Sequence, residues 1–222
     1  MKPLRMIVFD WDGTLMDSEA RIVGCLRAAM ADINLPDQPD SQLKNVIGLG
    51  LREALQRLYP EGTEKEHTEL TNRYRYHFLE ASSIPSMLFD GATTLLEKLN
   101  HQGYFVTIAT GKGRIGLDKV LEETGIADLF HYTRCADETR SKPHPQMIEE
   151  LMDWCGVEPH ETLMVGDTEY DLQMAENAGA HSLAVSYGVH DKDRLLACSP
   201  LDCVDSMTEL SNWLTTRVKC AA

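Results

Sequence analysis

The fold is decided by residues 6–15, which read Met-Ile-Val-Phe-Asp-Trp-Asp-Gly-Thr-Leu. The first four residues form a short apolar run typical of a buried strand, and two aspartates follow where that strand would end. Because residues two apart share a face of extended backbone, Asp10 and Asp12 can point into one site while Trp11 points away. Two carboxylates this close suit one ionised nucleophile and one proton carrier, unless a cation lies between them. The simpler alternative is an Asp-Gly turn at a strand end.

Short apolar runs occur at five places and alternate with longer stretches of helical spacing. This alternation predicts βα units with right-handed crossovers, and therefore an α/β fold with a parallel sheet. Such sheets bind ligands at the carboxyl ends of their strands, so the residues directly after each run are the candidates for a site. The five predicted strands cover residues 5–10, 104–110, 131–136, 162–166 and 181–185.

An inserted helical domain is predicted between the first two runs. About ninety residues separate these runs, far more than one crossover needs. Apolar residues recur there at helical spacing, and no strand pattern interrupts them. We therefore predict a small helical domain over residues 17–86, inserted into a core made of residues 1–16 and 87–222. Asp17 or Ser18 fits the N-cap of its first helix.

The composition excludes several classes of protein. With 222 residues, 43% hydrophobic and 25% charged, the chain can bury a full core. Its net charge of −14 repels phosphate backbones and anionic membranes, so we expect neither nucleic acid nor a membrane as a partner. The apolar run before Asp10 is too short for a signal peptide or a membrane span, and we expect a cytoplasmic protein. The six cysteines lack metal-ligand spacing, which predicts reduced thiols without zinc or disulfides.

The second run leads into Ala109-Thr110-Gly111-Lys112-Gly113. A hydroxyl followed by a turn of small residues that enters a helix places the Thr110 side chain and backbone N–H groups where a phosphoryl oxygen can bind. Two alternatives stay open here. Thr110 can be a simple helix N-cap. The spacing Gly111-x-Gly113-x-x-Gly116 also fits a dinucleotide-binding fingerprint, with an acidic residue about twenty positions further on.

A lysine follows the third run, and two aspartates follow the fourth. We expect Pro143 to start the next helix and to hold Lys142 at the rim of the sheet, where its charge can serve carboxylates and a phosphate. Asp167 ends the fourth run, and Asp171 lies on the same face of the following helical turn. Oxygen ligands in this arrangement suit Mg²⁺. The simpler alternatives are an exposed lysine and an aspartate that caps a helix.

The joint order of these residues resembles the haloacid-dehalogenase-like (HAD-like) hydrolase superfamily. Its four motifs match Asp10–Leu15, Thr110, Lys142 and Asp167–Asp171, and the resemblance covers nearly the whole chain, including a helical cap inserted just after the first motif. Within the superfamily the chain looks most like enzymes of the phosphoglycolate-phosphatase type. The resemblance implies a doubly wound, Rossmann-like parallel sheet with the first strand at its centre, and it makes residues 17–86 the cap.

The resemblance also implies roles for the acidic residues. Asp10 is then the nucleophile that accepts the phosphoryl group, and Asp12 protonates the leaving oxygen and later deprotonates the attacking water. The expected cofactor is Mg²⁺, held by Asp10, the backbone carbonyl of Asp12 and Asp167. Asp171 would either ligate the metal or orient Lys142.

The resemblance places phosphate and substrate binding on other residues. Thr110, the amide of Gly111 and Lys142 would bind the phosphoryl oxygens. The cap would close over the site and exclude water. Its segment 46–52 resembles the family's substrate-contacting segment, so Arg52 is the candidate to meet a second anionic group, unless it is an ordinary surface arginine. The expected substrate is a small phosphorylated metabolite such as phosphoglycolate or a sugar phosphate.

The residue at the position of Asp12 distinguishes several classes of protein within the superfamily. Dehalogenases of the superfamily lack an aspartate at the position of Asp12, phosphonatases have alanine there and transport ATPases have threonine, so Asp12 favours phosphoester chemistry. Phosphomutases share this aspartate, and an isomerase of sugar phosphates therefore remains an alternative. A non-catalytic phosphate-sensing protein that keeps the fold is the second alternative. No particular oligomeric state is predicted.

Overall fold

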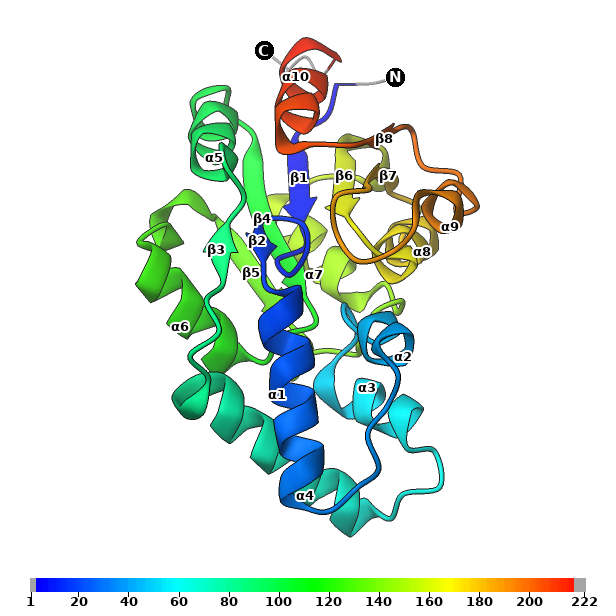
Figure 1. Cartoon of the computed structure of the whole chain (residues 1–222). Helices are drawn as coiled ribbons and strands as arrows, with labels where there is room; N and C mark the ends of the chain where they lie inside the picture. The colour runs from blue at the N-terminus through cyan, green and yellow to red at the C-terminus, as the bar shows by residue number, and fades with distance from the viewer. Residues whose placement is uncertain (1–2, 218–222) are drawn as a thin grey trace.

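A six-stranded parallel sheet forms the centre of the molecule, in the order β5-β4-β1-β6-β7-β8. The structure is a computed structural model and describes residues 3–217. Figure 1 shows β1 in the middle of this sheet, between β4 and β6. The strands are β1 (Met6–Phe9), β4 (Phe105–Thr110), β5 (Tyr132–Cys135), β6 (Thr162–Gly166), β7 (His181–Val185) and β8 (Cys203–Val204).

The prediction of a doubly wound α/β sheet with the first strand at its centre is confirmed. The chain winds outward from β1 to β4 and β5, and then returns to the other side of β1 with β6, β7 and β8. Strand β8 was not predicted, because two residues are too few to carry a hydrophobic pattern. The order reverses at β1, which makes the carboxyl end of β1 the place where such a sheet binds ligands.

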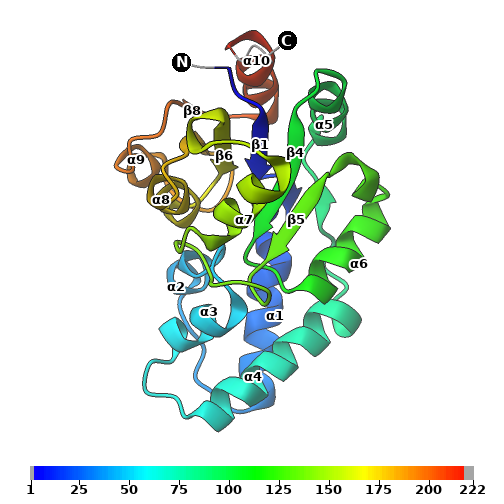
Figure 2. The same cartoon turned by 180° about the vertical axis from the view of Figure 1, so that it is seen from behind.

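Helices cover both faces of the sheet, as the two opposite views in Figures 1 and 2 show. One face packs against α5, α6 and α10, and the other packs against α7 and α8. These helices are α5 (Ala92–His101), α6 (Arg114–Thr124), α7 (Gln146–Cys155), α8 (Glu169–Asn177) and α10 (Met207–Arg217). Shorter elements are the 3₁₀ turns η2 (Ala127–Leu129) and η3 (Pro159–Glu161), and helix α9 (Lys192–Leu196).

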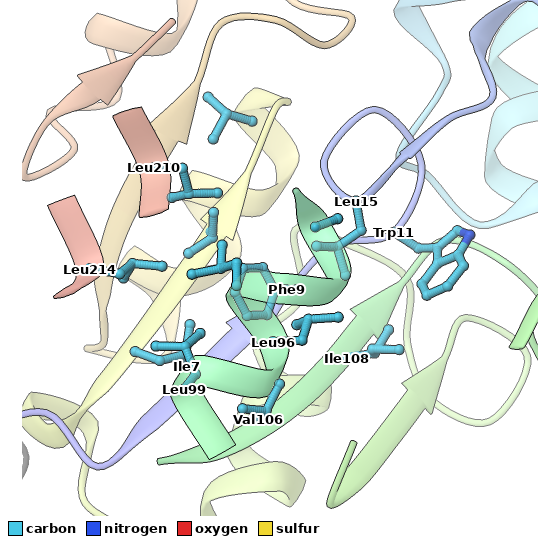
Figure 3. Packing of buried hydrophobic residues seen from close by; sticks show 14 of the residues in the cluster. Ile7, Phe9, Trp11, Leu15, Leu96, Leu99, Val106, Ile108, Leu210 and Leu214 are labelled. Carbon is cyan, nitrogen blue, oxygen red and sulfur yellow. The ribbon is translucent and has the colours of Figure 1, made fainter. Parts of the chain in front are cut away.

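The two faces of β1 belong to two different hydrophobic clusters. Ile7 and Phe9 pack with residues of α5 and α10, as Figure 3 shows, whereas Met6 and Val8 pack with residues of α7 and α8. All four side chains are fully buried. A strand that is buried on both faces has to be apolar at every position, which explains the continuous apolar run before Asp10.

The segment between β1 and α5 is helical and has a hydrophobic cluster of its own. Its elements are α1 (Glu19–Asp32), α2 (Asp40–Asn45), α3 (Leu51–Leu58), α4 (Glu64–Tyr76) and the π-helical turn η1 (His77–Ala81). Helix α4 begins with a capping box, in which Thr63 accepts from the Glu66 amide and the Glu66 carboxylate accepts from the Thr63 amide. In Figure 1 these helices lie below the carboxyl ends of the strands.

A two-stranded antiparallel ribbon joins this helical segment to the sheet. It pairs β2 (Met16–Asp17) with β3 (Met87–Leu88), so that the outgoing and the returning chain lie side by side. Neither strand was predicted, because each is again only two residues long. We retain residues 17–86 as the proposed extent of the cap.

Among residues 3–217, none of the helices combines the length and the apolar character needed to cross a bilayer. The cysteines in this part of the chain are free thiols, and three of them, Cys25, Cys135 and Cys155, are buried. Cys220 lies outside the described residues.

Candidate active site

A buried lysine joins two buried aspartates where the central strand ends. The Nζ atom of Lys142 donates to Oδ1 of Asp10 and to Oδ1 of Asp171, both at 2.6 Å. The three side chains are almost completely excluded from solvent. Burial opposes the charge on Lys142, but the two carboxylates outweigh it and raise the pKa of Lys142 above its ordinary value. The lysine therefore stays charged inside the protein.

Asp167 completes a group of three carboxylates. One oxygen each of Asp10, Asp167 and Asp171 lies within 4.8 Å of the others. The pairing of β1 with β6 explains the approach, because the Asp10 amide donates to Val165 at 3.0 Å and Asp167 follows two residues later. The order of motifs in the sequence had predicted that these side chains lie close together, and the structure places them in one site.

Burial makes the charged forms of two of these carboxylates unfavourable. It raises the pKa of Asp10 well above its ordinary value, and Lys142 only partly offsets this effect. Burial and the neighbouring Asp171 raise the pKa of Asp167 to about 7. Within residues 3–217, Oδ2 of Asp10 is buried and has no hydrogen-bond partner. An additional positive charge nearby would therefore stabilise the ionised forms of these carboxylates.

Asp171 is fully occupied by protein groups. Its Oδ1 accepts from Lys142, and its Oδ2 accepts from the amide of Thr168 at 3.1 Å and from the Thr168 hydroxyl at 2.6 Å. The contact from the Thr168 amide is one half of the capping box of α8, which begins at Glu169. Of the two roles considered for Asp171, this geometry favours the orientation of Lys142. Asp167 is not the cap of α8; that position belongs to Thr168.

Asp12 lies at the edge of a cavity and contacts Ser18 and Lys112, neither of which was predicted to belong to the site. Its Oδ1 accepts from the Ser18 hydroxyl at 2.5 Å and lies 2.9 Å from Nζ of Lys112. Ser18 does occupy the N-cap position of α1, but its side chain makes no capping bond. Trp11, between the two aspartates, is buried in the hydrophobic core.

Thr110 ends β4 beside β1 and is completely buried. Its hydroxyl accepts from the Lys112 amide at 3.2 Å, whereas α6 begins only at Arg114 with Gly113 as its N-cap. The N-cap alternative for Thr110 is therefore wrong. Gly111 lines the same cavity as Asp10 and Asp12.

A carboxylate already occupies the N-terminus of α6, where a dinucleotide would place its pyrophosphate. The Arg114 amide donates to both carboxylate oxygens of Asp137, at 2.9 and 3.2 Å. An anionic pyrophosphate would need these N–H groups and would be repelled by Asp137. Close packing explains two of the three glycines: a Cβ on Gly111 would lie 2.5 Å from the Leu49 carbonyl oxygen, and one on Gly113 would lie 2.7 Å from Oδ2 of Asp137, whereas a Cβ on Gly116 would meet no atom within 4 Å.

The expectation that Pro143 starts a helix is wrong. Helix α7 begins at Gln146, and Pro145 occupies its N-cap position. Residues 141–145 instead form a short turn, in which the His144 amide donates to the Ser141 carbonyl at 3.0 Å. Lys142 is therefore held by a loop and by its two carboxylate partners.

A cavity of about 490 Å³ lies between the helical segment and the loops of the sheet. Asp10, Asp12 and Gly111 line it from the sheet, and Arg52 lines it from α3. The Arg52 side chain is 68% exposed and pairs with Glu64 at 3.4 Å. The structure thus places Arg52 on the cavity, exposed to solvent and paired with Glu64.

The chain matches the family described as haloacid dehalogenase-like hydrolase over residues 7–185. It belongs to the haloacid dehalogenase-like hydrolase family. The match includes all four motifs and most of the sheet, so the predicted family and its hydrolase class are confirmed.

Similar proteins bear names that agree with this family. The chain is 34% identical to "Probable phosphatase IndB" of Dickeya dadantii, over 95% of this chain and 92% of the relative. It is 29% identical to "Phosphoglycolate phosphatase" of Nitrosococcus oceani, over 97% and 98% of the two chains. A crystal structure named as a predicted phosphoglycolate phosphatase of Haemophilus somnus has a TM-score of 0.86 at 26% identity, covering 96% of this chain and 98% of the other.

In this hydrolase the surroundings of Asp167 were the main feature missed from the sequence. Its Oδ1 accepts from the Thr14 hydroxyl at 2.9 Å and its Oδ2 accepts from the Val189 amide at 2.8 Å. A Cβ on Gly188 would overlap the Asp167 side chain. The residues after the first four runs had been considered, but residues 186–189, after the fifth run, had not. The same rule, applied to β7, would have found them.

Replacing Gly188 by alanine is expected to displace the Asp167 carboxylate and to reduce the activity of the hydrolase at least about tenfold, because no room exists for the added methyl group. Steady-state kinetics and thermal unfolding would measure both effects. Gly116→Ala is the matched control for folding, since a Cβ there meets no atom within 4 Å. Full activity of Gly188→Ala would show that the position of Asp167 is unimportant.

Proposed function

We propose that this hydrolase is a Mg²⁺-dependent phosphatase of small phosphorylated metabolites that works through an aspartyl-phosphate intermediate. The observation that carries the proposal is a buried group of three aspartates and a lysine, namely Asp10, Asp167, Asp171 and Lys142. A cavity lies beside this group, and Asp10 and Asp12 line it. The names of the relatives support a phosphatase, and two of them support phosphoglycolate as one candidate substrate.

The residues of the site fit a divalent cation of the Mg²⁺ type. All candidate ligands are oxygens, which Mg²⁺ prefers. Oδ2 of Asp10 lacks a partner among the described residues, and burial raises the pKa of both Asp10 and Asp167. Asp10, Asp167 and the backbone carbonyl of Asp12 would hold the ion. When bound, Mg²⁺ supplies positive charge to these carboxylates and to the phosphoryl group.

Asp10 and Asp12 divide the chemistry between them. An oxygen of Asp10 attacks the phosphorus, the bond from phosphorus to the ester oxygen breaks, and Asp12 gives that oxygen a proton so that it leaves as an alcohol. A water then attacks the phosphorus of the aspartyl phosphate while Asp12 takes one of its protons. The bond between Asp10 and the phosphorus breaks, which releases inorganic phosphate, restores the Asp10 carboxylate and leaves Asp12 protonated, as it was at the start.

The remaining residues of the site bind the phosphoryl group and position Asp10. Lys142 holds Asp10 in place and offers its charge to the phosphoryl oxygens, while Asp171 orients Lys142. Thr110 and the Gly111 amide would bind the phosphoryl oxygens from the end of β4. Since the protein groups act by position and charge, small displacements within the site are costly.

The proposal predicts Mg²⁺-dependent release of inorganic phosphate from p-nitrophenyl phosphate and phosphoglycolate, and its loss in EDTA. Release that is unchanged by EDTA would contradict the metal requirement. An isomerised phosphate that needs a sugar bisphosphate activator would favour the phosphomutase, and binding of phosphate without turnover would favour the phosphate-sensing protein.

The effect of Mg²⁺ on stability is expected to depend on pH. Asp167 keeps its proton up to about pH 7 in the folded protein, whereas an unfolded aspartate loses it near its ordinary pKa of 3.8. Between these values the metal-free folded state binds more protons, so this group makes the protein less stable as pH rises. Mg²⁺ needs the ionised carboxylate. We therefore expect Mg²⁺ to raise the melting temperature more at about pH 8 than at about pH 5.5.

Thermal unfolding with saturating Mg²⁺ and with EDTA, at both pH values, measures this difference. His190 is buried and its pKa is lowered to about 4, which acts on stability in the opposite sense, but its contribution cancels between the two samples at each pH. Asp167→Asn is the control and should lose most of the Mg²⁺ effect. An equal rise in melting temperature at both pH values would contradict the prediction.

A further inference from the structure

The cavity beside Asp10 and Asp12 extends far beyond the space that a phosphoryl group needs. Its volume of about 490 Å³ falls in the range typical of pockets for ligands much larger than a two-carbon acid. The cavity is this large even though the helical segment rests directly on the loops of the sheet. The Gly50 amide donates to the Ser141 hydroxyl at 2.7 Å, and the Tyr170 hydroxyl donates to the Asn45 carbonyl at 2.7 Å.

Apart from Asp10 and Asp12, most of the side chains that line the cavity are apolar. They come from three separate parts of the chain: helix α1, the segment from the end of α2 into α3, and the segment from α4 into η1, with one more from α6. Principal members are Leu26, Leu49, Leu51, Phe78, Leu79 and Ile115. Tyr74 also lines the cavity, and burial raises its pKa well above the ordinary value, so its phenol is neutral. This apolar wall of the cavity suits an uncharged group.

The charged residues of the lining do not provide a site for a second anion. Lys112 is already paired with Asp12 at 2.9 Å, and its Nζ lies 4.2 Å from the centre of the Phe78 ring. Arg52 is exposed and paired with Glu64 at 3.4 Å. Arg75 is exposed on α4.

Carboxylates outnumber cations on the lining. The acidic lining residues are Asp10, Asp12, Glu53 and Asp137, against Arg52, Arg75 and Lys112. A substrate carboxylate in this cavity would lose water without gaining a buried, unpaired cation in return.

We propose that the preferred substrates of this enzyme are phosphomonoesters whose leaving group is uncharged, largely apolar and larger than two carbons. An example is an aromatic ring joined to the ester oxygen through a short alkyl chain. The inference rests on the proposed phosphatase function and specifies its substrate class. The phosphoryl group lies at Asp10, and the leaving group fills the apolar part of the cavity and departs as a neutral alcohol after protonation by Asp12. Small dianionic acids such as phosphoglycolate are poorer substrates.

A matched set of three alkyl phosphates tests this assignment. Ethyl phosphate, phosphoglycolate and benzyl phosphate share the unit O–CH₂ and differ only in a methyl, a carboxylate or a phenyl group. With Mg²⁺, kcat/KM for inorganic phosphate release is expected to be at least about tenfold higher for benzyl phosphate than for ethyl phosphate, because the ring is removed from water. Phosphoglycolate is expected to be no better than ethyl phosphate.

Substitutions at residues that line the cavity test whether the cavity causes this substrate preference. Leu51→Lys places a cation in the apolar wall and is expected to lower the ratio of kcat/KM for benzyl phosphate over phosphoglycolate at least about fivefold, whereas Leu51→Met keeps an apolar side chain of similar volume and keeps the ratio. Ile115→Lys repeats the change at a position that is 71% exposed, where folding is not at risk. An unchanged ratio in both lysine variants would overturn the assignment of the cavity.

The outcomes separate the substrate class from the function itself. If phosphoglycolate is the fastest substrate, or if benzyl phosphate gains nothing over ethyl phosphate, the inferred substrate class is wrong while the phosphatase stands. If Mg²⁺ produces no phosphate release from any of the three, the phosphatase function is wrong and the inference is overturned with it.

Discussion

Asp10→Asn is expected to lower kcat for phosphate release at least about 10⁴-fold while the protein stays folded. An amide cannot form the acyl phosphate that a carboxylate forms. The substitution keeps the shape of the side chain and removes one of three crowded, buried carboxylates, and Lys142 still has Asp171 as a partner at 2.6 Å. The melting temperature in EDTA should therefore be equal to that of the wild type or higher.

Phosphate release and thermal unfolding, measured on the same preparation, test both parts of this prediction. The control is Asp153→Asn, at an exposed position on α7, which should leave kcat unchanged. Turnover of Asp10→Asn within tenfold of the wild type would remove Asp10 as the nucleophile. A loss of activity together with unfolding would instead indicate that Asp10 is needed for the structure.

Lys142→Met should affect both stability and activity. Methionine has a similar length, but it leaves the buried carboxylates of Asp10 and Asp171 without their common cation. Removing one partner from a buried ion pair typically costs about 3–5 kcal/mol, and we expect a loss of that size in the free energy of unfolding. Activity should fall at least about a hundredfold, because the phosphoryl group loses a positive charge. Urea unfolding in EDTA and steady-state kinetics measure the two effects.

The matched control is Lys192→Met, which breaks an ion pair with Asp205 of the same 2.6 Å length on the surface. Both of those side chains are about half exposed, so water replaces the lost interaction and the unfolding curve should barely move. If the two methionine variants are equally stable, burial does not make the Lys142 contacts important. Retention of stability with loss of activity would restrict Lys142 to a catalytic role.

The central strands of the sheet could be predicted from the sequence because they are buried on both faces. Residues 6–9 are apolar at every position for that reason, and the same holds for most of β4 and β6. The strands β2, β3 and β8 could not be predicted, since two residues carry no periodicity and their pairing is determined by tertiary contacts. The start of α7 was placed too early, because a proline after Lys142 fits a turn as well as a first helical residue.

Asp10 and Asp167 were predictable because each follows a strand directly, and parallel strands end at the same edge. Lys142 and Asp171 lie a few residues further on, in the loop after β5 and in the first turn of α8. The contacts that hold the side chains of the site were not predictable. Ser18 was expected to act as an N-cap, and its hydroxyl instead binds Asp12. The partner of Asp167 at Val189 is a backbone amide, and backbone amides leave no trace in the residue pattern. Sequence spacing thus identifies which groups meet, whereas the supporting hydrogen bonds depend on loop geometry.

The ribbon of β2 and β3 has a consequence for how an alcohol product leaves. Both chain crossings between the sheet and the helical segment run through this one pair of hydrogen-bonded strands. The helical segment can therefore tilt about a single hinge without breaking any strand pairing of the main sheet. What resists the tilt is a small set of contacts on the far side, such as Gly50 with Ser141 and Asn45 with Tyr170. Opening the exit in this way exchanges a few hydrogen bonds for water and leaves intact the pairing of β1 with β6, which brings Asp10 and Asp167 together.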